Sequence, residues 1–219
     1  MPDTPSPFEK SNTLAFFPTY IWAHDLKPAD RDAVNESITA RLKELLPADG
    51  QLAVGRSYQT RTDMQNDPAF ARLLTLADEA ARSALAFLDH APLPLRVTGC
   101  WGNVSPPGVH HPEHAHPNNV LSGVYYLRAP QGANTISFHD PRPQAHIIAP
   151  PVVKQTQKHA STVELGAVPG RMFLFPAWMR HSVNANESGE IRVSVAFNFM
   201  LENFIDSASK PRFDGSLEK

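Results

Sequence analysis

The stretch Ile191-Arg-Val-Ser-Val-Ala-Phe-Asn198 alternates apolar residues with polar or small ones. Because successive side chains of a strand point to opposite faces of a sheet, this pattern predicts a strand with one apolar and one polar face. The polar face could point to solvent. It could also line the interior of a barrel, where Arg192 and Ser194 would bind a carboxylate through guanidinium and hydroxyl hydrogen bonds. The second interpretation predicts a functional site inside a β fold.

Short β-rich segments, separated by Pro, Gly and Asn, fill the chain from His90 to this strand. That many strands at short spacing are typical of a sandwich or barrel. The predicted strands are Leu95–Val104, Val109–His116, Val120–Arg128, Thr135–His139, Ala145–Val153, Thr162–Leu165, Arg171–Phe175, Arg180–Val183 and Ile191–Phe199.

The chain before His90 has a different pattern. Leu14–Trp22 is aromatic and β-branched, which predicts a first strand with Pro18 at an edge or a bend. Apolar residues recur at helical spacing from Pro28 to Leu46 and from Asp67 to Asp89, and Asp67-Pro68 suits a helix start. The sequence therefore predicts two long helices followed by a mainly β region.

We expect a single domain over residues 1–219, of the mainly β class with N-terminal helices (α+β). Its parts would be a flexible lead-in (1–11), a strand with two supporting helices (12–90), a β core with the metal site (91–200) and a C-terminal tail (201–219).

Composition excludes several functions. The chain has 219 residues, 42% hydrophobic and 19% charged, which is typical of a globular protein. A net charge of -2 provides no positive field for nucleic acid. The single cysteine excludes an intrachain disulfide and a zinc site built from several thiolates. The sequence has no signal peptide and no membrane-spanning run, so we expect a cytoplasmic protein whose metal, if any, is held by His, Asp or Glu.

The segment His110-His-Pro-Glu-His-Ala-His116 gathers several metal-ligating side chains. On a regular strand His110, His114 and His116 share one face, and His111 and Glu113 share the other. The two groups could serve one metal only if Pro112 lies at a bulge. An H-x-H pair on one face provides two adjacent imidazoles for one ion. The third ligand must come from elsewhere, and His181, at the start of a later strand, is the best candidate.

Several motifs resemble the 2-oxoglutarate- and iron(II)-dependent oxygenases, specifically the prolyl-hydroxylase-like branch and its bacterial group of uncharacterised members. The similarity runs from Phe16-Phe17-Pro18 to Asn198. Its densest motifs are His114-Ala-His116-Pro, Leu121-Ser-Gly-Val-Tyr-Tyr-Leu127, Ile136-Ser-Phe-His-Asp-Pro-Arg142, Pro169-Gly-Arg-Met-Phe-Leu-Phe-Pro176, His181-Ser-Val and Arg192-Val-Ser194.

The resemblance implies a double-stranded β-helix, or cupin-like jelly-roll barrel, flanked here by the two long helices. It implies an Fe(II)- and 2-oxoglutarate-dependent dioxygenase that hydroxylates a small-molecule or peptide substrate. His114, His116 and His181 would be the metal ligands. Arg192 and Tyr126 stand where the family binds the far carboxylate of 2-oxoglutarate, with Ser194 assisting. A homodimer is possible, and neither nucleic acid nor a membrane is an expected partner.

The sequence departs from the family at His116, where the motif usually carries an acid. Three neutral imidazoles can bind iron(II), but they leave the site one negative charge short. Glu113 or Asp140 are alternative sources of the carboxylate. A cupin-like three-histidine dioxygenase or a zinc hydrolase, both acting without 2-oxoglutarate, would explain the same ligands. A non-catalytic barrel that binds a small ligand is a further alternative.

Overall fold

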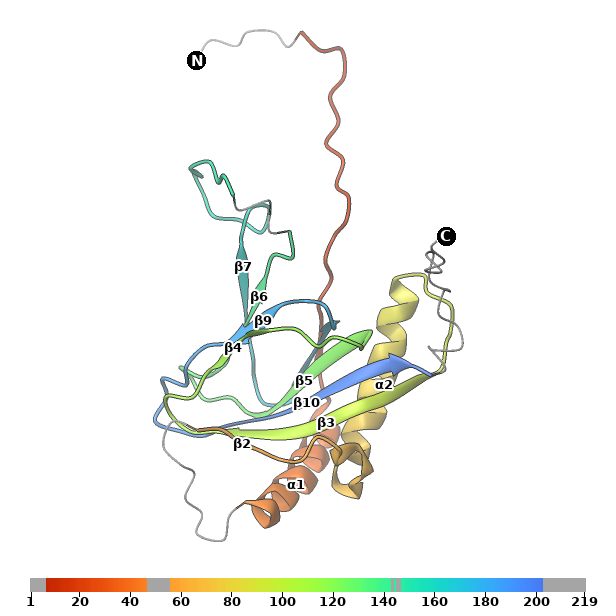
Figure 1. Ribbon diagram of the computed structural model, residues 1–219, viewed down its shortest axis with the longest axis vertical. Coiled ribbons are helices and arrows are strands. Elements are labelled where there is room, and N and C mark those ends of the chain that lie inside the picture. Colours follow the sequence, from red (N-terminus) through yellow and green to blue (C-terminus); the bar gives the residue numbers. More distant parts are fainter. Residues whose placement is uncertain (1–6, 47–55, 143, 145–146, 203–219) are drawn as a thin grey trace, which may run out of the picture.

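Ten strands form two antiparallel sheets in the computed structural model, which describes residues 7–46, 56–142, 144 and 147–202 (Figure 1). The larger sheet has the order β1-β8-β5-β10-β3-β2, and the smaller sheet has the order β4-β9-β6-β7. The strands are β1 Trp22–Asp25, β2 Tyr58–Gln59, β3 Leu95–Ser105, β4 His111–His114, β5 Leu121–Arg128, β6 Thr135–His139, β7 Thr162–Gly166, β8 Arg171–Pro176, β9 His181–Val183 and β10 Arg192–Leu201.

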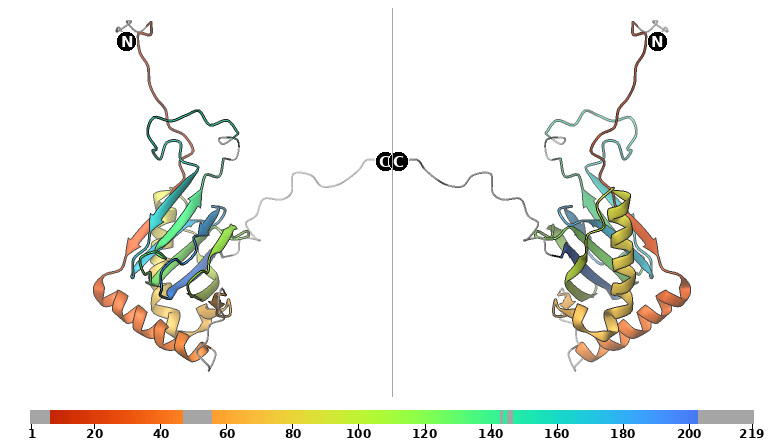
Figure 2. Two further views of the ribbon diagram at one scale, coloured as in Figure 1. Left: turned by 90° about the vertical axis from the view of Figure 1, so that its left-hand side faces the viewer. Right: turned by 90° about the vertical axis from the view of Figure 1, so that its right-hand side faces the viewer.

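Two helices cover the face of the larger sheet that is turned away from the smaller one (Figures 1 and 2). Helix α1 spans Pro28–Leu45 and begins with its proline in the first turn. Helix α2 spans Ala71–Phe87 and follows a short 3₁₀ turn, whose start Asp67 caps by accepting a hydrogen bond from the Ala69 amide at 3.0 Å. The two predicted helices are therefore present, and both lie on one side of the β core.

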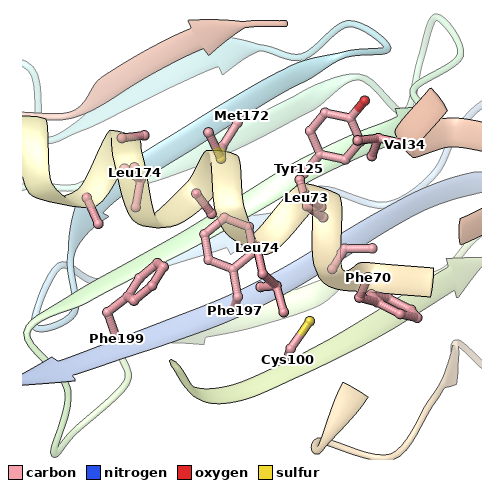
Figure 3. Packing of buried hydrophobic residues seen from close by; sticks show 14 of the residues in the cluster. Val34, Phe70, Leu73, Leu74, Cys100, Tyr125, Met172, Leu174, Phe197 and Phe199 are labelled. Atoms are coloured by element: carbon pink, nitrogen blue, oxygen red, sulfur yellow. The ribbon is translucent and has the colours of Figure 1, made fainter. Parts of the chain in front are cut away.

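A core of large apolar side chains joins the helices to the larger sheet (Figure 3). Phe70 and Leu73 come from the α2 region, and Phe197 and Phe199 come from β10. Gly123 of β5 pairs with Phe197, and a Cβ at this glycine would overlap the Phe197 ring. A side chain at position 123 would therefore push the ring out of place.

A second core lies between the two sheets. Tyr126, Phe173 and Phe175 of the larger sheet pack with Ile136 and Phe138 of the smaller one. Along β8 the side chains alternate between the two cores, as the period of two in a strand requires. The result is a mainly β protein of two packed antiparallel sheets, as the jelly-roll prediction requires.

Two predicted strands are wrong. Leu14–Tyr20 is exposed and forms no strand, and the first strand begins only at Trp22. The reason is local, because Phe17 adopts a left-handed φ of 58° directly before Pro18, which has no amide N–H to donate.

Residues 147–153, the described part of the predicted strand Ala145–Val153, also form no strand. This segment contains Pro150-Pro151, and proline cannot donate to a strand ladder. Conversely, β2 was not predicted, because two residues carry no periodic signal. Most of the predicted C-terminal tail, residues 203–219, lies outside the described residues. No helix in the described part of the chain is long and apolar enough to cross a membrane.

Candidate metal centre and carboxylate-binding cavity

A cavity of about 290 Å³ lies between the two sheets, on the inner face of the larger one. Polar or titratable side chains from both sheets and from their connections line it, and its described lining residues include no aspartate or glutamate. These polar lining residues are Gln59, Thr62, Trp101, Asn103, His111, His114, His116, Tyr126, His181, Arg192 and Ser194.

Three of these residues form the one group of potential metal ligands found within the described part of the chain. A nitrogen atom from each of His114, His116 and His181 lies within 4.8 Å of the other two. The ring centroids are 5.0 Å apart for His114 and His116, 4.3 Å for His114 and His181, and 5.2 Å for His116 and His181. Three nitrogen donors gathered in this way could hold one metal ion.

The backbone orients two of the imidazoles. Strand β4 pairs with β9 so that His114 lies opposite His181. The Nδ1 atoms of His114 and His181 lie 2.8 Å from the Pro112 carbonyl and 2.9 Å from the Met179 carbonyl. Because a carbonyl can only accept, each Nδ1 carries the proton, which leaves each Nε2 with a free lone pair. A carbonyl that accepts from one ring nitrogen fixes the orientation of the ring and presents the other nitrogen to a metal.

His116 lies just beyond the end of β4 and is anchored by its backbone. Its amide donates to the Ala177 carbonyl at 2.9 Å, which ties it to the turn between β8 and β9. Burial lowers the pKa of His116 to about 4, and the neighbouring His114 adds to this shift. Burial likewise lowers the pKa of His181 to about 4. Both rings are therefore neutral at pH 7 and can donate their lone pairs.

The histidine segment contains a bulge at Pro112 that changes which side chains share a face. His111 lies opposite Val183 and His114 lies opposite His181. The step from His111 to His114 is three residues in β4, whereas the matching step in β9 is two, so β4 contains one extra residue. As a result His111 joins His114 on the cavity side. His110, predicted to share that face, precedes the strand, is exposed and does not line the cavity.

The two alternative carboxylates face elsewhere. Glu113 forms an ion pair with Arg180, and this contact lowers the pKa of the Glu113 carboxyl. Asp140 pairs with Arg142 at 2.8 Å and accepts a hydrogen bond from its amide at 3.0 Å. Neither residue belongs to the group of three ligands found among the described residues.

The other predicted site residues lie on the inner face of the larger sheet. Ser194 of β10 is directly opposite Tyr126 of β5 on one side and Asn103 of β3 on the other. Arg192, two residues from Ser194, is 2% exposed, and its Nη1 donates to the Asn184 carbonyl at 3.4 Å. Its Nη2 is buried and has no hydrogen-bond partner among the described residues, as is also true of the Asn103 Oδ1. The polar face of β10 therefore points into the cavity and not to solvent.

Sequence reasoning missed His111, Gln59 and Thr62 as cavity residues. The signal for His111 was present, because a proline inside a strand pattern marks an edge or a bulge. Gln59 comes from the two-residue strand β2 and Thr62 from the connection that follows it, so no periodicity could have identified either.

Comparison with known proteins agrees with this geometry. Residues 99–198 match the protein family described as "Putative 2OG-Fe(II) oxygenase", where 2OG is 2-oxoglutarate. This range begins in β3 and ends in β10, and it includes both sheets except for β1 and β2. It also contains the three histidines, Tyr126, Arg192 and Ser194. No curated protein matches the sequence.

Solved structures with a similar fold have low sequence identity. The non-haem α-ketoglutarate-dependent epimerase SnoN of nogalamycin biosynthesis matches with a TM-score of 0.59 and 16% identity, over 92% of this chain and 91% of its own. HygX from Streptomyces hygroscopicus, solved with nickel and 2-oxoglutarate, has a TM-score of 0.59 and 13% identity, over 84% and 83%. A prolyl hydroxylase from Trichoplax adhaerens, in complex with a peptide fragment, has a TM-score of 0.58 and 13% identity, over 87% of both chains. The β core of this chain is thus similar in sequence to the 2OG-Fe(II) oxygenase family over residues 99–198, and it shares the fold of these solved structures.

Proposed function

We propose that this protein is an iron(II)- and 2-oxoglutarate-dependent dioxygenase that hydroxylates a small-molecule or peptide substrate. In this proposal His114, His116 and His181 hold the metal, and Arg192 binds the far carboxylate of 2-oxoglutarate with the help of Tyr126 and Ser194. The observation that carries it is the placement of three convergent imidazoles and a buried guanidinium nitrogen without a partner in one cavity.

The donor set fits iron(II). Neutral imidazole is a good ligand for this borderline ion, and the orientation of His114 and His181 favours their Nε2 atoms as the donors. Three ligands leave the remaining positions of the metal for the co-substrate and dioxygen. With 2-oxoglutarate and dioxygen, the bound iron would supply the oxidising chemistry. One oxygen atom of dioxygen would go to succinate as carbon dioxide leaves, and the other would go to the hydroxylated product.

The charges of the cavity favour a dianion. Arg192 keeps its positive charge, and the lining contributes no carboxylate among the described residues. Because the metal and Arg192 both attract negative charge, a dicarboxylate such as 2-oxoglutarate would satisfy both ends of the cavity. The buried Nη2 of Arg192, which has no acceptor among the described residues, would gain one from the bound carboxylate.

The walls of the cavity would keep bulk water from the reacting atoms. Phe175 and Ile136 are buried beside the histidines, and the ring centroid of Phe175 lies 4.6 Å from that of His181. A water-poor wall strengthens the electrostatic interactions inside the site.

The decisive test is 2-oxoglutarate turnover in the iron-loaded wild type and in Arg192→Ala, measured as succinate formed without added substrate. We expect the wild type to decarboxylate 2-oxoglutarate slowly. The variant should keep one metal ion per chain and lose turnover, because the guanidinium contact with the carboxylate is removed. Equal turnover in both proteins would contradict the role of Arg192.

The cupin-like dioxygenase and the zinc hydrolase gain support from one observation, the absence of a carboxylate from the metal-ligand group of the described residues. Each predicts a bound metal and no 2-oxoglutarate turnover in the wild type. The same assay therefore distinguishes these functions from the proposed one.

A further inference from the structure

The side chain of His111 has no role in the proposed metal centre, yet it faces the same cavity. The bulge at Pro112 turns it there, since without the extra residue His111 would lie on the outer face with Glu113. A proline within a four-residue strand interrupts the hydrogen-bond ladder, which costs stability. The result of this interruption is an imidazole at a site where the regular pattern would place none.

The His111 ring is not a structural hydrogen-bonding group. Neither of its nitrogens forms a hydrogen bond with another residue in the part of the chain that the structure describes, whereas those of His114 and His181 do. It is half-buried, and its side chain lines the cavity. It also lies outside the group of three metal ligands.

The surroundings of His111 point to an anion. Burial lowers the pKa of His111 to about 4, and the positive charge of Arg192 is the next largest cause. His111 lies opposite Val183 of β9, and the Arg192 Nη1 donates to the carbonyl of the next residue, Asn184, at 3.4 Å, so the imidazole and the guanidinium lie near each other. At pH 7 the imidazole is neutral with one N–H to donate. Arg192 itself has a buried Nη2 without a partner. Two unused donors, one from each sheet, therefore border the same end of the cavity.

A carboxylate has two oxygens and can accept about four hydrogen bonds. Arg192, Ser194 and Tyr126 all project from the larger sheet, so they can contact a bound carboxylate from one side only. His111 projects from the smaller sheet on the opposite side. With its donor added, the carboxylate would be held from both sheets.

We propose that His111 is a further co-substrate-binding residue, whose ring N–H donates to the far carboxylate of 2-oxoglutarate opposite Arg192. This inference rests on the proposed function. It assigns to the Pro112 bulge the task of bringing this donor into the cavity.

The test is calorimetric titration of the iron(II)-loaded protein with 2-oxoglutarate under anaerobic conditions, where turnover cannot occur. His111→Ala should bind 2-oxoglutarate about tenfold to a hundredfold more weakly than the wild type, as expected when a hydrogen bond to a charged group is lost. His110→Ala is the matched control, because it removes the neighbouring exposed histidine, and its affinity should equal that of the wild type.

A second probe separates contact with the carboxylate from a general disturbance of the site. 2-Oxopentanoate keeps the 2-oxo acid group that chelates a metal but has a methyl group in place of the far carboxylate. Its affinity should be the same in His111→Ala and the wild type. His111→Asn and His111→Gln place an amide N–H near the positions of Nδ1 and Nε2, and one of them should recover part of the affinity for 2-oxoglutarate.

Unchanged 2-oxoglutarate affinity in His111→Ala would overturn the inference. An equal loss for both probes, or a loss of metal from the variant, would also overturn it, because His111 would then support the metal centre. Failure of the wild type to bind 2-oxoglutarate would instead overturn the proposed function itself, so the two failures are distinguishable.

Discussion

The two faces of strand β10 differ in whether all groups of their buried side chains have interaction partners. On the helix side Val195 and Phe197 are fully buried in apolar contacts. On the cavity side of the same strand, Arg192 and Ser194 are also buried, and the Arg192 Nη2 has no hydrogen-bond partner among the described residues. Burial of the apolar face stabilises the fold, whereas a buried donor without a partner on the cavity side lowers its stability unless a ligand binds. One strand thus contributes to the stability of the fold on one face and provides proposed ligand-binding residues on the other.

A substitution that removes a large side chain from the apolar face of β10 should have the largest effect, a loss of stability. Phe197→Ala removes a fully buried ring from the core between β10 and the helices, where Gly123 leaves space for it. We expect the free energy of unfolding to fall by about 3–5 kcal/mol, from the lost burial and the cavity left behind. Urea unfolding of the metal-free protein measures this. A decrease below about 1 kcal/mol would show that this face does not hold the fold together.

Breaking the cavity side should affect binding and leave folding largely intact. His181→Ala removes a proposed ligand, and we expect the affinity for iron(II) to fall by more than roughly a hundredfold. Loss of a residue that only hydrogen-bonds to a metal ligand already lowers metal affinity by up to about a hundredfold. The metal-free variant should still melt in one cooperative transition. Metal content after dialysis, together with the melting curve, provides the check. A variant that retains one iron per chain would exclude His181 as a ligand.

Lowering the pH should affect the buried histidines of the cavity before it affects the apolar core between the larger sheet and the helices. The pKa values of His111, His116 and His181 are lowered to about 4 in the folded chain, from 6.5 as the ordinary value. Between these values the unfolded chain binds more protons than the folded one, so the histidines stabilise the fold above about pH 6.5. This contribution is lost as the pH falls towards 4.

Melting temperatures of the chelator-treated protein from pH 7.5 to 5 measure this dependence in a range where the carboxylates remain ionised. We expect a steady fall, which should be smaller in His111→Gln. Iron binding should weaken over the same range, because protons compete for the ligands. A melting temperature that is constant down to pH 5 would contradict the burial of these rings.

The smallest effect is expected outside the cavity. Glu113→Gln breaks an exposed ion pair with Arg180, which should change the stability by less than about 1 kcal/mol. Iron(II) affinity should not change, because Glu113 points away from the three histidines. Isothermal titration with iron(II) tests this directly, and a large loss of affinity would restore Glu113 as the missing acid.

Regular patterns predicted most of this molecule, and local exceptions account for the errors. The alternation in β10 indicated both of its faces, and the spacing of Val34, Ile38 and Leu42 predicted the buried stripe of α1. The place of the first strand depends on one left-handed residue, Phe17, and the face of His111 depends on one bulge. Conformations of single residues leave no periodic trace in a sequence.

Which ligands converge is likewise a tertiary property. His116 and His181 are separated by four strands in the sequence and meet because β4 pairs with β9. The H-x-H spacing could propose two ligands, but only the sheet order shows which distant histidine completes the set. Sequence alone could also not decide between His116 and the two acidic alternatives, since the ion pairs of Glu113 and Asp140 form across turns and strands.

The most direct test of the account is anaerobic titration of the metal-free protein with iron(II) and then 2-oxoglutarate, followed by visible spectroscopy and metal analysis. We predict one iron per chain and the weak charge-transfer band of the 2-oxoglutarate chelate, with the iron retained and the band lost in Arg192→Ala. Protein purified without chelator that contains one zinc per chain, and that shows no band after iron replaces the zinc, would contradict the account. The cavity would then belong to a hydrolase or to a binding protein.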